Sequence, residues 1–457
     1  MDPATNNVRI PSLIDGAKDV AELALPSMGS FILSYMQSVV IGISLGALND
    51  DAILAAFGLG SLVSNLLGFS VGIGLLTALD SLVATAAGEG NLSLASLHLT
   101  RGRIVVILVF IPCTVAMLMS GSILESIGQD PLASRYAQDF VTANAIGLLP
   151  AFLFTADAAF LRGYQWNTPV LAVNVISAAT QPFVCIVLVN WLRWDLWGAG
   201  LSVALSSWTR FIMLQVYMRR VTGHPEPAEA ASIPKFLSLI REAIASPGLW
   251  QFISLALPSA ALTWCEWWVY ELQSIIAGWL GVAELAAFVV CCNIEVLLFM
   301  IPLGIQQAAA VLVGNSLGTD NPILAIQYAQ LSVAMGAMVA ICVSLFILQF
   351  RDNLARIYTQ DPLVLSILTS ALVLVAGYHF LSALNCILEG VLRGLRLQGK
   401  AVPVKVLSMI IYQLPVAYFF SKTLGINGIW LACISALILT LWAYTRILAS
   451  KCNEVLN

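Results

Sequence analysis

The sequence contains little charge and few of the residues that form enzyme active sites. Only 10% of its 457 residues are charged, 59% are hydrophobic, and the mean hydropathy is +0.89. Because soluble domains carry about 25% charged residues, most of this chain is predicted to lie in a lipid bilayer. The three histidines, His98, His224 and His379, are far apart and form no HExxH motif, so no metal site is predicted.

Other absences exclude further classes of protein. The nine cysteines are scattered, mostly within apolar runs, and are predicted to be small buried residues rather than disulfides. No GxxxxGK[ST] motif and no stretch long enough for a soluble domain is present, which argues against an ATPase or a kinase. No basic patch indicates nucleic-acid binding. Residues 1–26 lack the short apolar core of a signal peptide, so none is predicted.

Apolar runs of helical length recur throughout the chain. About 20 apolar residues cross a bilayer as a helix, and a helix satisfies its own backbone polar groups in lipid. The runs predict twelve transmembrane helices, at residues 27–49, 52–79, 104–124, 140–156, 163–192, 196–209, 243–265, 296–319, 321–350, 364–388, 406–421 and 423–445.

Lysine and arginine residues outside these spans are unevenly distributed between the two membrane faces. With twelve spans both termini lie on one side, and fourteen of these residues fall on that side against five on the other. The richer side is normally cytoplasmic, so both termini are predicted to be cytoplasmic. The sequence does not distinguish the plasma membrane from a vacuolar or other organelle membrane.

The second half of the chain repeats the first. Matching segments recur 230 to 232 residues apart: LALPS at 23–27 and 255–259, LAAF at 54–57 and 285–288, LRG at 161–163 and 392–394, and GEGN at 88–91 against GTDN at 318–321. A nearly constant offset predicts an all-α integral membrane protein of two parallel six-helix repeats, with a substrate cleft between them.

This repeat divides the chain into three parts. We expect an N-terminal six-helix lobe at 1–218, a cytoplasmic linker at 219–248 and a C-terminal six-helix lobe at 249–457. The linker is rich in Pro, Glu and Ala at first, and then carries Phe236, Leu237, Leu239, Ile240 and Ile244 at helical spacing. That spacing predicts a short interfacial helix on the membrane surface.

The stretch TWCEWWVYELQS, residues 263–274, places two carboxylates in an apolar helix. A charge near the bilayer centre costs at least about 2.5–3.5 kcal/mol, and burial favours the protonated carboxyl. Glu266 lies near the middle of its span and shares a helix face with Tyr270, four residues later. We therefore expect Glu266 to bind a proton or a cation, with Glu271 as its companion.

Other polar residues inside the spans are weaker candidates. Glu389 is expected either to contribute to the site or to pair with Arg393 one turn later. Glu295 faces either the cleft or another helix, and Asp80 and Asn315 suit gating or helix-end hydrogen bonds. The remaining candidates for hydrogen bonds to substrate are Gln37, Asn65 and Asn293, each of which is also suited to interhelical bonding.

Five stretches carry a likeness to a known family. They are NLLGFSVGIGLLTALDSLVATAAGEGN (65–91), LRGYQWNTPVL (161–171), LALPSAALTWCEWWVYE (255–271), IPLGIQQAAAVLVGNSLGTDNP (301–322) and GVLRGLRLQGKA (390–401). Together the chain resembles the multidrug and toxic compound extrusion (MATE) transporters, and the Glu-Trp-Trp of the seventh span resembles their eukaryotic branch.

The resemblance implies an antiporter with a V-shaped cavity between two lobes. Entry of protons, or of sodium in some relatives, would drive export of organic cations, other xenobiotics or metabolites without ATP or another cofactor. The proton-coupled glutamate of the family falls on Glu266 and a second acidic residue on Glu271. The expected partners are a small organic cation or metabolite, a proton and the lipid bilayer, and the expected state is a monomer.

The sequence departs from the family pattern at four places. Leu312 stands where an arginine is common, Thr85 stands where a glutamine is usual, and GALN (46–49) replaces Gly-His-Leu-Gly. The acidic residue that some animal relatives carry in the tenth helix would align near Ser382 rather than Glu389. These differences affect the expected substrate range and the role of the tenth helix more than the fold.

Two alternative functions fit the sequence less well than an exporter. A flippase for lipid-linked substrates would need a basic cavity for a phosphate head group. Arg210 and Lys405, which adjoin the runs 196–209 and 406–421, are the only basic residues assigned to the spans. An integral membrane enzyme would need a cluster of His and Asp residues, or a nucleophile with its base. The isolated His98 and His379 argue against such an enzyme.

Overall fold

The computed structural model describes residues 12–48, 50–220 and 233–456. In this part of the chain all regular structure is helical, either α-helix or one of three short π-helical segments. The predicted all-α fold class is therefore confirmed. The predicted linker falls partly on residues 221–232, which lie outside the described residues.

The helices of the N-terminal half follow one another with short connections. In chain order they are α1 (Leu13–Gly46), α2 (Asp51–Ser64), η1 (Asn65–Phe69), α3 (Ser70–Gly88), α4 (Leu92–Leu118), α5 (Ser120–Ser126), α6 (Pro131–Ala145), α7 (Leu148–Gly163), α8 (Thr168–Ile186), η2 (Val187–Trp191) and α9 (Asp195–Arg220). In sequence order, the helix α10 (Ile233–Ile244) follows these helices and precedes the C-terminal half.

The C-terminal half has longer and fewer helices. They are α11 (Ser246–Leu280), α12 (Val282–Gly318), α13 (Pro322–Tyr358), α14 (Pro362–Gly394), α15 (Gln398–Lys405), η3 (Val406–Gln413), α16 (Leu414–Leu424) and α17 (Ile426–Leu456). The segments α2–η1–α3, α8–η2 and α15–η3–α16 each run on as one continuous helical rod.

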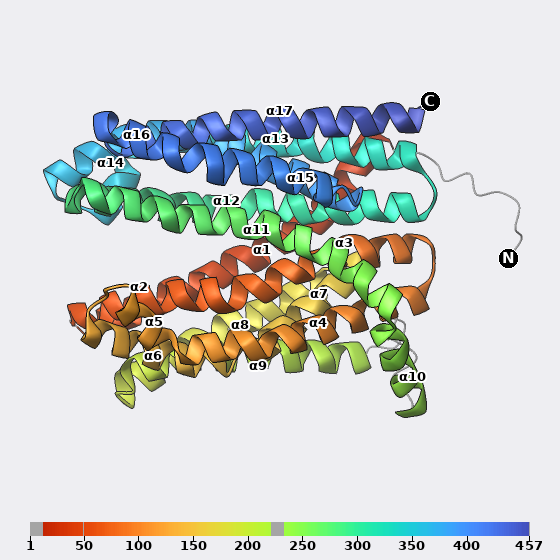
Figure 1. The fold of residues 1–457 in the computed structure, drawn as a ribbon, viewed down its shortest axis with the longest axis horizontal. Helices are drawn as coiled ribbons and strands as arrows, with labels where there is room; N and C mark the ends of the chain where they lie inside the picture. Colours follow the sequence, from red (N-terminus) through yellow and green to blue (C-terminus); the bar gives the residue numbers. More distant parts are fainter. Residues whose placement is uncertain (1–11, 49, 221–232, 457) are drawn as a thin grey trace, which may run out of the picture.

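By length and composition, nine helices of the described chain can cross a membrane, or ten if the pair α6–α7, bent by 48°, is one span. The helices α9 and α11, of 26 and 35 residues, are also long enough but less apolar. Adding these two gives the twelve rods of the prediction, six in each half. Figure 1 shows the two halves as two layers, mainly α1 to α9 below and α11 to α17 above, with the start of α1 and the end of α17 at the same end of the molecule.

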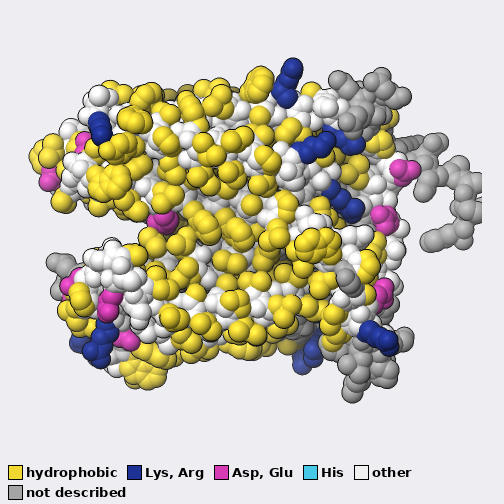
Figure 2. Space-filling model, in the orientation of Figure 1, with side chains coloured by type: hydrophobic (Ala, Val, Ile, Leu, Met, Phe, Trp, Pro, Cys, Tyr) yellow, Lys and Arg dark blue, Asp and Glu magenta, His cyan; other side chains and the backbone are white. Residues whose placement is uncertain are grey.

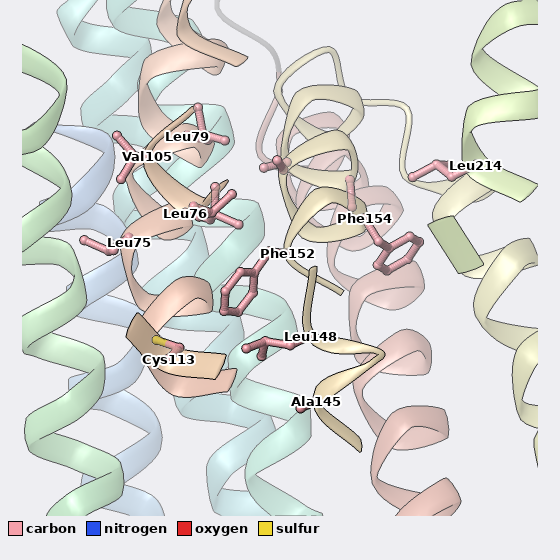
Figure 3. Close-up of a cluster of buried hydrophobic side chains, with 14 of the residues drawn as sticks. Leu75, Leu76, Leu79, Val105, Cys113, Ala145, Leu148, Phe152, Phe154 and Leu214 are labelled. Atoms are coloured by element: carbon pink, nitrogen blue, oxygen red, sulfur yellow. The ribbon is translucent and has the colours of Figure 1, made fainter. Parts of the chain in front are cut away.

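Each half has its own apolar core. In the N-terminal half, α3, α4 and α7 contribute Leu76, Val105 and Phe152 to a buried cluster, which Figure 3 shows in close-up. A second cluster in the C-terminal half surrounds the fully buried Trp430 of α17. A third buried cluster joins the two halves, with Val20 of α1 packed among residues of α12 such as Ile305. Apolar packing therefore also holds the halves together.

The two halves separate at the end of the molecule opposite the termini. Figure 2 shows a notch between the upper and lower halves at that end, which narrows toward the end that carries the termini. This shape agrees with the predicted V-shaped cavity. Most of the surface on either side is apolar, as expected of side chains that face lipid.

At the narrow end, repeat-related segments of the two halves meet. Gly88 ends α3 and Gly318 ends α12, and these are equivalent residues of the GEGN and GTDN segments. A Cβ on Gly88 would overlap the backbone of Asn315, and a Cβ on Gly318 would overlap the backbone of Thr85. The Asn315 amide also donates a 2.8 Å hydrogen bond to the Gly163 carbonyl oxygen. Close backbone contact at the two glycines and the hydrogen bond of the Asn315 side chain thus both contribute to closing this end.

The helix α10 lies beside the N-terminal half near the end that carries the termini (Figure 1). Its buried residues Leu239 and Ala243 pack against Leu97 of α4. It covers most of the predicted interfacial helix, although the side chains of Phe236 and Leu237 lie outside the described residues. The lobe boundaries at 218 and 248 remain predictions.

The close backbone contacts at Gly88 and Gly318 can be tested by substitution. Gly88→Ala and Gly318→Ala should each hold the two halves apart at the end that carries the termini, because overpacking of this kind costs about 1–3 kcal/mol. The distance between spin labels on the first turns of α4 and α13, measured by double electron–electron resonance, should increase in both variants. Gly58→Ala, which has no atom within 4 Å of its Cβ position, is the matched control. Unchanged distances in both glycine variants would contradict this account of the closure.

Candidate functional site

Two carboxylates and one lysine meet inside the C-terminal half. Lys405, the last residue of α15, places its Nζ 2.5 Å from Oε1 of Glu389 on α14 and 3.3 Å from Oε2 of Glu266 on α11. The side chains of Lys405 and Glu389 are each 2% exposed, whereas that of Glu266 is 15% exposed. Glu266 is therefore the member of this triad that solvent can reach.

The charges of this triad do not balance. One lysine faces two carboxylates, so the fully ionised triad carries one excess negative charge. Burying an ion costs several kcal/mol, which is offset only when opposite charges and hydrogen bonds surround it. Among the described residues Lys405 is the one cation in contact with the two carboxylates, and the buried Arg393 adds a positive charge near Glu389 at longer range. By its direct contacts the triad can therefore take up one proton or one further cation.

Glu389 has a different partner from the one suggested by its spacing. The sequence favoured an ion pair with Arg393, but Arg393 donates a 3.1 Å hydrogen bond to Thr263 Oγ1 instead. Besides Lys405, Glu389 accepts a 3.3 Å hydrogen bond from the hydroxyl of Tyr444 on α17. The pair with Arg393 is thus not formed, because α15 brings a lysine closer than the helical neighbour.

A second buried pair lies in the same half. Glu295 on α12 contacts His379 Nδ1 on α14 at 3.0 Å, and neither side chain is exposed. Tyr270 and Tyr378 join their hydroxyls at 2.6 Å, so Tyr270 is engaged with α14 rather than with Glu266. The structure therefore places Glu295 and Tyr270 in interhelical contacts between α11, α12 and α14.

The remaining candidates of this half are peripheral to the triad. Glu271 is partly buried, and among the described residues it makes no hydrogen bond or ion pair. Asn293 is exposed, and its carbonyl oxygen accepts a 3.3 Å hydrogen bond from the hydroxyl of Tyr35, a residue of the other half. Trp264, near Glu266 on α11, donates a 2.9 Å hydrogen bond to the carbonyl oxygen of Ser70. The helix α11 thus contacts both halves.

In the N-terminal half, Gln37 and Asn65 line a cavity of about 170 Å³. Gln37 on α1 donates hydrogen bonds to Ser177 Oγ at 3.1 Å and to Ser206 Oγ at 3.4 Å. Asn65 begins the π-helical segment η1, and such segments often lie at functional sites. The structure therefore places both of these predicted residues in the wall of the same cavity.

The buried acids of the N-terminal half are paired with arginines. Asp80 on α3 accepts hydrogen bonds from Arg162 at 2.9 and 3.1 Å. Asp157 on α7 pairs with Arg103, and Gln215 donates to its other oxygen at 2.5 Å. Asp80 is thus fixed within its own half, whereas Asn315 bonds across the two halves.

Lys405, Tyr444 and His379 were not assigned to the site from the sequence. Lys405 was the one lysine within a predicted span, and a buried lysine needs acidic partners. This was the signal that could have directed attention to Glu266 and Glu389. No comparable signal identified Tyr444 or His379. In the described chain no group of three or more His, Cys, Asp or Glu residues could hold a metal ion.

The family model MatE matches the chain twice, at residues 26–187 and again at residues 258–419. The chain belongs to the MatE family. The second match begins 232 residues after the first, which confirms the internal repeat. Members of this family are transporters rather than enzymes. The resemblance seen in the sequence motifs is thereby confirmed.

Relatives of this MatE protein match most of its length and are themselves longer. The chain is 29% identical to multidrug and toxin extrusion protein 1 of Homo sapiens, covering 88% of this chain and 68% of that protein. The protein of the same name from Mus musculus is 27% identical over 92% of this chain and 73% of its own. The crystal structure of the eukaryotic MATE transporter AtDTX14 superposes with a TM-score of 0.88 at 22% identity, covering 96% of each chain.

Removal of the shared cation should destabilise this MatE protein in a pH-dependent way. In Lys405→Gln the buried Glu389 loses the cation that contacts it and keeps only the longer-range charge of Arg393. Breaking a buried pair costs about 3–5 kcal/mol unless the carboxyl takes a proton. Between about pH 5 and about pH 8, the folded variant then holds more protons than its unfolded chain, so its stability falls as the pH rises. Thermal unfolding in detergent should show this fall.

Two further variants make this test specific. The double variant Lys405→Gln with Glu389→Gln removes the uncompensated charge and should regain stability at about pH 8. Lys422→Gln, which removes an exposed lysine over the ring of Tyr418, should behave like the parent. A Lys405→Gln protein as stable as the parent at both pH values would show that the triad carries no such charge imbalance.

Proposed function

We propose that this protein is a secondary active antiporter that exports organic cations, xenobiotics or metabolites in exchange for protons, with sodium as the alternative coupling ion. The observation that carries the proposal is the triad in which one buried lysine is shared by Glu266 and Glu389. Membership of a transporter family and the two-lobed fold with a notch between the lobes support the same function.

The geometry suggests how a proton would be coupled to transport. A proton on Glu266 neutralises its carboxylate and so removes the attraction in its 3.3 Å contact with Lys405. Lys405 then remains in contact with Glu389 at 2.5 Å. Loss of that proton restores the excess negative charge, which Lys405 or a cationic substrate then balances. Rocking of one half against the other would expose this site to the two membrane faces in turn.

The flippase alternative is not favoured by the positions of the two basic residues in the spans. Lys405 is occupied by two carboxylates in the C-terminal half. Arg210 lies on α9 in the N-terminal half, beside Ser207 and the ring of Phe154. The two cations therefore do not form one basic cavity of the kind that a phosphate head group needs.

We further propose that the protein works as a monomer in its membrane, with both termini in the cytoplasm and without a cofactor. The notch lies at the end opposite the termini, so in this orientation the structure is open to the outside. A proton gradient directed inward would then load Glu266 from the open side.

Substitution of Glu266 tests the proposal. In proteoliposomes with separately imposed proton and sodium gradients, the parent should move members of a panel of organic cations and anions against the proton gradient. Glu266→Gln should reduce this gradient-driven transport by about tenfold or more, since the exchangeable proton is lost. Glu125→Gln, which changes an exposed glutamate of α5, is the control. Transport by Glu266→Gln at the parental rate would overturn the proposed role.

A further inference from the structure

The cavity of the N-terminal half differs in charge from the triad of the C-terminal half. It lies among α1, α2, η1, α6, α8 and α9, and its volume is about 170 Å³. Its walls combine hydroxyl and amide side chains with the rings of Phe57, Phe69 and Phe140. Arg210 of α9 is the one ionisable side chain among the residues that line it.

Arg210 has little to balance its charge. Its contacts are a weak 3.4 Å hydrogen bond to Ser207 Oγ and the ring of Phe154, whose centroid lies 5.4 Å away. By contrast, Arg103 and Arg162 of the same half are each bound by an aspartate. A guanidinium offers five N–H donors, and among the described residues Arg210 contacts no carboxylate.

Several buried polar atoms around the same cavity also have no partner in the described chain. They are Oγ of Ser64, Oδ1 of Asn144, Oε1 of Gln181 and Nε of Arg210. Ser64, Asn144 and Gln181 are only 2%, 3% and 2% exposed. Because buried polar groups are almost always hydrogen-bonded, a group of unpaired ones about one cavity indicates a polar occupant.

We propose that this cavity binds the carboxylate group of an organic anion, with Arg210 as its counter-ion. An organic anion bound here would be a substrate of the proposed transporter. Only the statement that the bound anion is transported rests on that proposed function. Arginine pairs with carboxylates through two parallel hydrogen bonds, and Ser64 has a hydroxyl to add a third. The three phenylalanine rings suit a planar apolar body, while the carbonyl oxygens of Asn144 and Gln181 accept from a ligand hydroxyl.

The electrostatics exclude a simple organic cation from the same place. A cation here would face Arg210 with no carboxylate on the cavity wall, and like charges repel strongly in a site of low dielectric constant. The acidic triad and the cavity thus sit in different halves, with opposite sign. A proton and a carboxylate substrate could therefore occupy the protein without competing for one group.

A direct binding measurement tests this inference. Calorimetric titration of the purified protein in detergent, without any gradient, should show binding of 4-hydroxybenzoate and at least about tenfold weaker binding of the uncharged 4-hydroxybenzamide. Equal affinity for the acid and the amide would overturn the proposal in the unaltered protein. Tetraethylammonium competing with 4-hydroxybenzoate would also overturn it.

Variants then locate the site. Arg210→Gln should weaken 4-hydroxybenzoate binding by about tenfold to a hundredfold, and Arg210→Lys should retain part of the affinity. Arg135→Gln, which removes an exposed arginine of the same half, should bind like the parent. Full affinity in Arg210→Gln would place the anion elsewhere and contradict the inference.

Repeating the titration with Glu266→Gln separates the two proposals. If the cavity binds the anion as inferred, this variant should bind 4-hydroxybenzoate with parental affinity, whether or not proton-driven transport fails. If the parent protein does not bind 4-hydroxybenzoate but still shows transport that depends on Glu266, the anion site alone is rejected. Normal binding with transport that is independent of Glu266 would reject the proton site alone.

Discussion

The sharing of one buried lysine between two carboxylates is the interaction on which the C-terminal half depends. Lys405 connects α15 to α11 and α14 through its contacts with Glu266 and Glu389. Either carboxylate would balance its charge, so in a region of low dielectric constant the second carboxylate of the triad has no contacting cation of its own. Structure and chemistry are thus linked, because the contacts that hold three helices together are also those that a proton would alter.

The two halves repeat one another in topology but differ in their polar interiors. Both begin with a long helix that contains a proline, Pro26 in α1 and Pro258 in α11, and they meet where Gly88 and Gly318 bring backbone against backbone. Within this frame the C-terminal half holds an acidic triad, whereas the N-terminal half pairs its acids internally and leaves Arg210 unpaired. The two halves thus share a topology but differ in the charge of their polar interiors.

Much of the architecture followed from the sequence because it depends on local or periodic features. Apolar runs predicted the spans, the constant offset predicted the repeat, and the acidic Glu266 was identified by its apolar surroundings. The partners of that glutamate could not be predicted, since Lys405 is 139 residues away and only the packing of α15 against α11 brings the two together. The expected Glu389–Arg393 pair failed for the same reason. A neighbour four residues along the helix was available, but a tertiary partner was closer.

We propose that Glu266 is the carboxyl that takes up a proton within the triad. Infrared difference spectroscopy on acidification of the purified protein measures this directly, because a newly protonated carboxyl in a dry site has its own C=O band. The account predicts that this band appears in the parent, is lost in Glu266→Gln and persists in Glu295→Gln. A band that remains unchanged in Glu266→Gln would contradict the account and move the exchangeable proton to another carboxylate.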